Sequence, residues 1–149
     1  MEASITFKGV GKTISNEILL ANLSFGVEKG STFVLIGENG SGKTLVLKLL
    51  VGLIEKDVGS VYVHGKDVAT RSIETRSICG YMPQIVNLDD QMTVFQNLSI
   101  YAQLYGLNSL KAKKNCMHWA EILDFSNLLN TFPKNLSYGN QRKILFARS

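Results

Sequence analysis

The eight residues from Gly37 to Thr44 constrain this chain more than any other feature. They read Gly-Glu-Asn-Gly-Ser-Gly-Lys-Thr, fit the pattern G-x-x-x-x-G-K-[ST], and follow an apolar run. This pattern between a buried strand and a helix is typical of a loop that binds phosphate. Glycines let successive backbone amides turn into one concavity, and the next helix adds the positive end of its dipole. We therefore expect a strand at Thr32–Ile36, the loop, and a helix at Lys43–Leu53.

Each residue type in this loop has its own part in holding phosphate. The residues expected to contact phosphate are Gly37, Glu38, Asn39, Gly40, Ser41, Gly42, Lys43 and Thr44. Lys43 brings a point charge to the outer phosphates, and the Thr44 hydroxyl is expected to bind magnesium. A dinucleotide-binding loop is disfavoured because the third glycine of G-x-G-x-x-G is missing. A small GTPase is disfavoured because the chain contains no Asn-Lys-x-Asp.

Alternating apolar residues predict further strands in the first half of the chain. Short strands are expected at residues 5–7, 23–28 and 61–63, with a turn at His64-Gly65 before residues 66–68. The apolar cluster Ile78–Met82, closed by a proline, predicts another short strand. Together with the helix after the glycine-rich loop, these strands indicate an α/β fold.

After residue 84 the pattern becomes helical. Thr93 and Gln96 have the spacing of a capping box, so a helix is expected to run to Tyr105, with Gly106 as its stop. Ser109 is expected to cap a second helix that ends near residue 124. The second half therefore reads as a helical section inserted into an α/β core.

Composition and charge exclude several classes of protein. Of the 149 residues, 45% are hydrophobic and 19% are charged, which excludes a disordered polar chain. No apolar stretch reaches the roughly 18 residues of a membrane-spanning helix. The net charge of +4 lies entirely in the last segment, and the balance of residues 1–124 argues against a nucleic-acid binder. The basic residues of that segment are expected to form a solvated helix face rather than to contact phosphate: Lys134, Arg142, Lys143 and Arg148.

Two further motifs resemble those of one family. Leu136-Ser137-Tyr138-Gly139-Asn140 resembles the signature motif of the ATP-binding-cassette (ABC) ATPases, and Tyr81-Met82-Pro83-Gln84 resembles their Q-loop. The phosphate loop, the glutamine and the signature follow one another in the family's order. The resemblance covers residues 4–149 and implies an α/β fold. That fold is a P-loop NTPase core of the ABC type with an antiparallel β subdomain and a helical insertion, incomplete at its C-terminus.

This resemblance also implies a division of residues 1–149 into parts of one nucleotide-binding domain. Residues 1–83 would be the ATP-binding core and antiparallel β subdomain, 84–135 the Q-loop and helical subdomain, and 136–149 the signature and the start of its helix. The implied ligands are ATP and Mg²⁺, with Thr44 and Gln84 at the metal and Gln84 near the attacking water. The signature would serve the ATP of a second cassette.

The resemblance further implies where such a chain works. Its partners would be a second ABC cassette, as a homo- or heterodimer, and a separate transmembrane subunit. Its place would be the cytoplasmic, inner face of a membrane, and its task the transport of a solute, with the exporter branch favoured. No nucleic acid is expected as a partner.

The sequence departs from the family's pattern at several positions. Ile14 stands where the family has an aromatic residue, so it would contact the base without stacking, and the choice between ATP and GTP stays open. Tyr138 and Asn140 replace the usual Gly and Gln. No acidic residue follows a run of four or five apolar residues, and His64 and His118 both precede the signature. The catalytic Glu and the switch His therefore have no counterpart, and we expect ATP binding without hydrolysis.

In the family, an apolar strand that ends in a magnesium-linked Asp and the catalytic Glu lies beside the phosphate-loop strand, and this sequence has no counterpart of it. Without it, residues 33–36 are expected to form an exposed apolar edge, as in a truncated chain, a decayed gene or one piece of a split protein. A steep, cooperative unfolding transition of the monomer would count against this expectation. Two other functions stay open. A soluble ABC ATPase acting on nucleic acid or the ribosome would show salt-dependent affinity for nucleic acid. A nonenzymatic nucleotide-binding regulator would bind ATP and release no phosphate.

Overall fold

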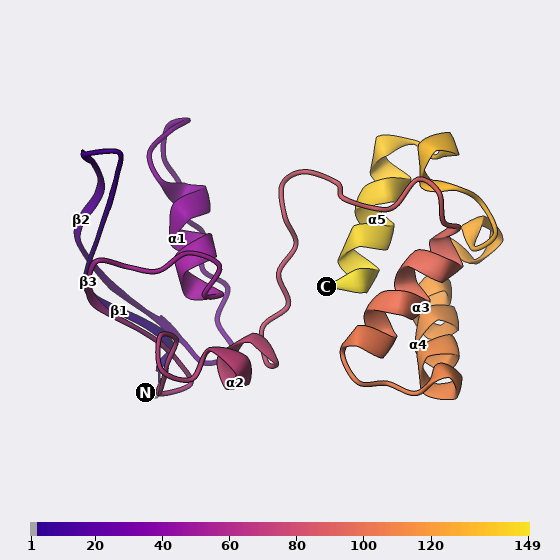
Figure 1. Ribbon diagram of the computed structural model, residues 1–149, viewed down its shortest axis with the longest axis horizontal. Helices are drawn as coiled ribbons and strands as arrows, with labels where there is room; N and C mark the ends of the chain where they lie inside the picture. The colour runs from indigo at the N-terminus through magenta and orange to yellow at the C-terminus, as the bar shows by residue number, and fades with distance from the viewer. Residues whose placement is uncertain (1–2) are drawn as a thin grey trace. The chain divides into compact units, whose positions relative to one another are not determined.

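A computed structural model describes residues 3–149, which form two compact units (Figure 1). The first unit ends at Gly80, and the second comprises Tyr81–Ser149. Each unit has its own hydrophobic core, so each is described by itself.

The first unit is built on a four-stranded antiparallel sheet with the strand order β2-β1-β3-β4. Its strands are β1 (Ala3–Ile14), β2 (Glu17–Glu28), β3 (Val58–Val63) and β4 (Lys66–Asp67). The first two strands are longer than the predicted segments because they form one long hairpin. Its turn residues, Ser15 and Asn16, have φ angles of 52° and 64°. Two-residue hairpin turns need such positive φ angles, and Asn16 is the sequence signal that the strand prediction missed.

Helix α1 (Lys43–Leu50) packs on this sheet and closes the first core. The core joins buried residues of the helix with those of the strands and the turn after β4: Phe7, Val10, Leu45, Val46, Leu49, Val61, Val63 and Val68. The helix ends at Leu50 and not at the predicted Leu53. Gly52 takes a left-handed φ of 66°, and the Leu53 amide donates to the Lys48 carbonyl at 2.9 Å. This is the glycine-terminated helix end that the sequence prediction overlooked. Helix α2 (Ser72–Arg76) completes the unit.

Two predicted strands are wrong. Residues 32–36 and 78–82 are both irregular, because no strand among residues 3–149 pairs with either segment. A strand requires a neighbour to accept and donate its backbone hydrogen bonds, however strong its own β propensity. The first segment is apolar and exposed, with 49% of Phe33, 68% of Val34 and 87% of Ile36 accessible. The expected apolar edge at residues 33–36 is thus exposed, but it is not an edge strand of the sheet.

The second unit is helical. It contains α3 (Val94–Leu104), α4 (Ser109–Ile122) and α5 (Tyr138–Arg148), with single 3₁₀ turns at Ser126–Leu128 and Pro133–Asn135. The predicted capping box is confirmed: the Gln96 amide donates to Thr93 Oγ1 at 3.2 Å, and the Thr93 amide donates to Gln96 Oε1 at 2.8 Å. The cap of α4 is Asn108 and not the predicted Ser109, because the Asn108 side chain accepts from the Lys111 amide at 2.9 Å.

The core of the second unit gathers around two side chains that have no exposed surface, Phe125 and Ile144. Buried residues of α3 and α4 surround them: Val94, Leu98, Cys116 and Ala120. Helix α5 therefore closes the helical unit with its apolar side. Across residues 3–149, no helix combines the length and apolar character needed to cross a membrane.

Candidate functional site: a phosphate loop and a signature helix

The glycine-rich loop ends in the first turn of α1. Gly40 and Gly42 have φ angles of 85° and 86°, which favour glycine over every residue with a side chain. Gly42 is the N-cap of α1, and no side chain caps the helix there. The first amides of the helix are therefore left as donors for another group. A Cβ atom on Gly37 would lie 2.7 Å from Ser41 Oγ, so a larger residue there would require the Ser41 side chain to move.

The ammonium group of Lys43 lies over this loop. Its Nζ donates to the Gly37 carbonyl at 2.8 Å and to the Glu38 carbonyl, and Ser41 Oγ is 3.4 Å away. The loop thus joins uncapped helix amides with a cation whose partners are neutral carbonyls. A phosphate oxygen would replace these carbonyls with a charged and stronger acceptor. The donor set of the loop therefore fits a polyphosphate, and the Thr44 hydroxyl follows in the same helical turn.

The β1–β2 hairpin lies beside the loop. A Cβ atom on Gly42 would come within 3.1 Å of Leu20 Cδ2, so β2 contacts the start of α1. Ile14 ends β1 at the hairpin turn, where it pairs with Glu17, and 42% of its surface is exposed. The first unit therefore contains both the phosphate loop and Ile14, the residue predicted to meet the base.

Asp57 links the end of β1 to the segment before β3 through hydrogen bonds. Its carboxylate accepts from Lys12 Nζ and from the Thr13 amide, both at 2.7 Å. The hydrogen bond from Lys12, followed by that from the Thr13 amide, lowers the pKa of Asp57 below its ordinary value. This contact fixes the strand directly before Ile14.

Because of this lowered pKa, the stability of the chain is expected to depend on Asp57 and on pH. A carboxyl group whose pKa is lower in the folded state stabilises the fold above its unfolded pKa, and this contribution is lost as the pH falls through the folded value. The melting temperature of Asp57→Asn should therefore lie below that of the wild type at about pH 7, and the two should converge as the pH falls below about 4. Thermal unfolding followed by circular dichroism from pH 7 downward measures this. A difference that stays constant over the whole pH range would contradict it.

The signature residues form the start of α5 in the second unit. Ser137 is the N-cap, and its Oγ accepts from the Asn140 amide at 3.3 Å. Tyr138 is 64% exposed, and a Cβ atom on Gly139 would meet no other group within 4 Å. Ser137 therefore caps the first turn of α5. The motif also presents an open surface at the positive end of a helix dipole.

Arg142 connects this signature helix to the Q-loop within the second unit. Its Nη1 donates to the carbonyl of Pro83 at 2.8 Å and to that of Gln84 at 3.1 Å. The expectation that the terminal basic residues are only a solvated face is therefore wrong for Arg142. The sequence shows its charge but not its partners, which lie 59 and 58 residues earlier in the chain.

Removing this link should loosen the Q-loop. The change Arg142→Ala deletes two charge-assisted hydrogen bonds, each worth about 1.5–3 kcal/mol when fully formed. With a discount for partial exposure, limited proteolysis within residues 84–88 should be roughly tenfold faster in this variant. Arg142→Lys, which keeps the charge, should restore part of the resistance to cleavage. The neighbouring exposed residue gives the control, since Lys143→Ala should leave the cleavage rate unchanged. An unaltered cleavage rate in Arg142→Ala would contradict the link.

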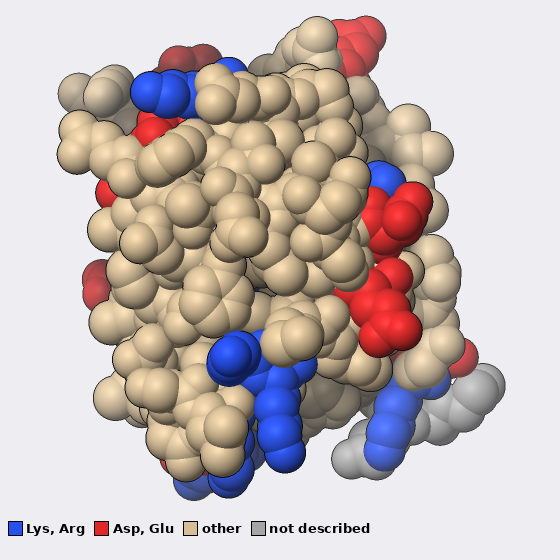
Figure 2. Space-filling model, turned by 90° about the vertical axis from the view of Figure 1, so that its right-hand side faces the viewer, with Lys and Arg blue, Asp and Glu red and all other residues tan. Residues whose placement is uncertain are grey.

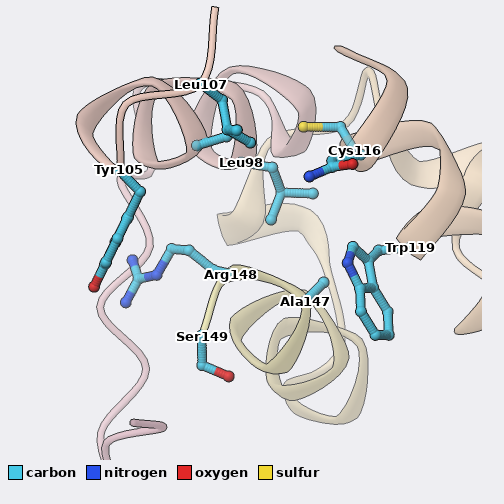
Figure 3. A pocket seen from close by; sticks show the side chains of 10 residues that line it. Leu98, Tyr105, Leu107, Cys116, Trp119, Ala147, Arg148 and Ser149 are labelled. Atoms are coloured by element: carbon cyan, nitrogen blue, oxygen red, sulfur yellow. The ribbon is translucent and has the colours of Figure 1, made fainter. Parts of the chain in front are cut away.

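Arg148 makes a second link of this kind near the end of α5. Its guanidinium lies 4.1 Å from the centre of the Tyr101 ring and donates to the Asn87 carbonyl at 2.9 Å and to the Asn87 side-chain oxygen. It borders a cavity of about 160 Å³ between α3, α4 and α5 (Figure 3). Trp119 lines the same cavity beside Ala147, which agrees with a packing role. Burial raises the pKa of the Cys116 thiol, so this cavity offers no ready thiolate.

The predicted site residues thus fall into two groups. Ile14 and the phosphate loop belong to the first unit, whereas Gln84 and the signature belong to the second. Within the described residues 3–149, no three His, Cys, Asp or Glu side chains gather as a metal site. The residues that the sequence prediction missed are Arg142 and Asp57. Each acts through a partner distant in the sequence.

Comparison with known proteins shows the family. A family model described as "ABC transporter" matches residues 20–149, so the chain belongs to the ABC transporter family. It is 35% identical, over 99% of its length, to the Nod factor export ATP-binding protein I of Burkholderia thailandensis. It is 32% identical, over 95% of its length, to the molybdate/tungstate import ATP-binding protein WtpC of Thermococcus kodakarensis. It covers 48% and 42% of these proteins, and so spans about half the length of the curated relatives it matches.

Solved structures confirm the fold. The ATP-binding subunit of an ABC transporter superposes with a TM-score of 0.84 at 24% identity, over 97% of this chain and 60% of that one. The protein cbiO1 of Clostridium perfringens, described as part of the ABC transporter complex cbiONQ, superposes with a TM-score of 0.85 at 17% identity, over 99% of this chain and 61% of that one. The predicted α/β fold of the ABC type, with its antiparallel sheet and its helical section, is therefore confirmed.

Proposed function

We propose that this chain binds Mg·ATP through Gly37–Thr44, as part of the ATP-binding subunit of an ABC transporter. The observation that carries this proposal is the uncapped start of α1 behind Gly40 and Gly42, with the Lys43 ammonium over the loop. Helix amides and a lysine so arranged bind phosphate groups. The Mg²⁺ that accompanies ATP would neutralise phosphate charge, with Thr44 as its ligand from the loop.

The remaining site residues would act around this nucleotide. Ile14 would contact the base through its apolar surface. Because it has no aromatic ring, stacking would not distinguish ATP from GTP. Gln84 would approach the metal and the attacking water. The signature residues would present helix-start donors to the nucleotide of a second cassette: Leu136, Ser137, Tyr138, Gly139 and Asn140.

Three successive parts of the chain would have different roles in nucleotide binding. Residues 1–83 would form the ATP-binding core with the antiparallel β subdomain, 84–135 the Q-loop with the helical subdomain, and 136–149 the signature with its helix. By itself this set of residues would bind ATP without hydrolysing it. The sequence offers no carboxylate after an apolar strand to orient water against the γ-phosphate.

At the level of the whole protein, we propose that ATP binding and hydrolysis drive solute transport. The subunit would pair with a second cassette and a transmembrane subunit at the cytoplasmic face of a membrane. The Nod factor export proteins among its relatives support export, whereas the molybdate/tungstate import protein supports the opposite direction. Transport assays on the whole complex, with solute supplied on one side at a time, decide between the two directions.

Calorimetric titration of the 149-residue chain with Mg·ATP tests the core of this proposal. We expect one nucleotide per chain and no phosphate release above the background of buffer alone. A chain that ignores Mg·ATP would overturn the proposal. A chain that also binds DNA or RNA with an affinity falling steeply with salt would favour a soluble ABC ATPase acting on nucleic acid.

A further inference from the structure

The α3–α4 hairpin has an unusual charge pattern. Residues 91–120 contain no aspartate or glutamate, but they contain Lys111, Lys113 and Lys114 in the first two turns of α4. All three lysines are exposed, and within the described residues 3–149 no carboxylate forms an ion pair with any of them. Residues 111–114 therefore carry an uncompensated charge of +3, and the one acidic residue of the two helices, Glu121, lies in the last turn of α4.

The tip of this hairpin is also apolar. Leu104, Tyr105 and Leu110 are 76%, 71% and 67% exposed, although the turn that carries them is well ordered by hydrogen bonds. Gly106 has a φ of 89°, and the Leu107 amide donates to the Ala102 carbonyl at 3.1 Å. The backbone between α3 and α4 is thus a closed turn between two packed helices (Figure 1), and Leu104 and Leu110 belong to the helix ends on either side of it.

The space-filling view shows how charge is spread over one side of the helical unit. In Figure 2, uncharged atoms cover the middle of this face, and basic side chains gather toward its lower edge. The turn between α3 and α4 and the start of α4 lie at the lower end of this unit in Figure 1. Exposed apolar side chains and unpaired lysines therefore share one end of the helical unit.

We propose that this tip, comprising Leu104, Tyr105 and Leu110 with the three lysines, binds the surface of an anionic lipid bilayer. Apolar side chains on a protruding turn can enter the headgroup region, and lysines beside them attract anionic lipids. Lysine also lets its aliphatic stem lie along apolar surface while its ammonium stays among the headgroups. Tyr105 borders the cavity between α3, α4 and α5, but Leu104 and Leu110 do not line it and are 76% and 67% exposed beside the lysines. Side chains that protrude in this way fit a lipid surface better than a pocket-bound protein segment. The inference goes beyond the proposed function, since attachment through a transmembrane subunit requires no direct lipid contact.

Flotation of the full chain with lipid vesicles tests this inference. Vesicles of phosphatidylcholine with about 30% phosphatidylglycerol should bind the chain, vesicles of phosphatidylcholine alone should bind it far less, and binding should weaken with salt. Replacing Lys111, Lys113 and Lys114 by glutamine should weaken the partition on the order of 100-fold, because each lysine contributes a factor of roughly five.

A matched variant tests whether vesicle binding depends on the position of the lysines or only on the net charge of the chain. Lys8, Lys29 and Lys143 are exposed on other elements, and their replacement by glutamine also takes the net charge from +4 to +1. This control should weaken vesicle binding by no more than a few-fold. An equal loss in both triple variants would overturn the inference, because non-specific attraction would then suffice.

Two double variants test whether the exposed apolar side chains of the tip contribute to vesicle binding. Leu104→Ser with Leu110→Ser should weaken binding by at least tenfold, whereas Ile18→Ser with Ile73→Ser, at residues 70% and 79% exposed in the first unit, should not. Circular dichroism of each variant confirms that its helices form. Absence of binding to anionic vesicles overturns the inference. Binding only to vesicles that contain a reconstituted membrane protein overturns it too, and assigns the tip to a protein partner.

Discussion

Replacement of Lys43 by alanine is expected to weaken Mg·ATP binding to this chain by about 150-fold or more. The ammonium lies over the loop on the carbonyls of Gly37 and Glu38, where a phosphate oxygen would take their place. Hydrogen bonds to charged groups contribute about 1.5–3 kcal/mol each, and the loss of two leaves phosphate charge unpaired in the loop. Calorimetric titration of wild type and variant with Mg·ATP gives the ratio of the two dissociation constants.

A lysine on the same helix provides the control for this experiment. Lys48 lies in the last turn of α1 and makes no side-chain hydrogen bond or ion pair among residues 3–149. Lys48→Ala removes the same charge from the same helix and should leave the dissociation constant within about twofold. Equal affinity for Mg·ATP in Lys43→Ala and wild type would mean that the loop is not the nucleotide site.

The parts of the site that the sequence predicts well are those that depend on neighbours along the chain. The phosphate loop needs glycines at fixed positions and one lysine a single residue after Gly42, and the structure has both at the start of a helix. The capping box at Thr93 and Gln96 is local in the same sense. In each case the groups that satisfy one another are a few residues apart, so their spacing alone predicts the contact.

The predictions that were wrong concern residues whose partners are distant in the sequence or absent from the described chain. Residues 32–36 and 78–82 have strand-like composition, but a strand is completed by a partner, and no strand of residues 3–149 lies beside them. Arg142 and Arg148 read as solvated charges, yet they donate to carbonyls about sixty residues away. The sequence shows the charge or the strand propensity of a residue. Which distant group forms a hydrogen bond with that residue depends on the fold.

The change with the largest expected effect on stability is Phe125→Ala. Phe125 has no exposed surface and belongs to the second core, with residues of α3, α4 and α5. Replacing a buried phenylalanine by alanine costs about 3–5 kcal/mol, which is a large part of the stability of an ordinary domain. The helical unit should therefore unfold at a much lower urea concentration, measured by the circular dichroism signal of its helices. Phe146→Ala, at a residue 53% exposed on α5, should shift the transition little.

The same variant tests whether the two cores act separately. The phosphate loop and Ile14 rest on the first core, which shares no residue with the core around Phe125. Mg·ATP should therefore bind Phe125→Ala with a dissociation constant within about twofold of the wild-type value, even where the helical signal is already lost. Loss of binding in step with the helical signal would show that the first core depends on the second. Nucleotide binding would then belong to the whole chain and not to the loop and the sheet beneath it.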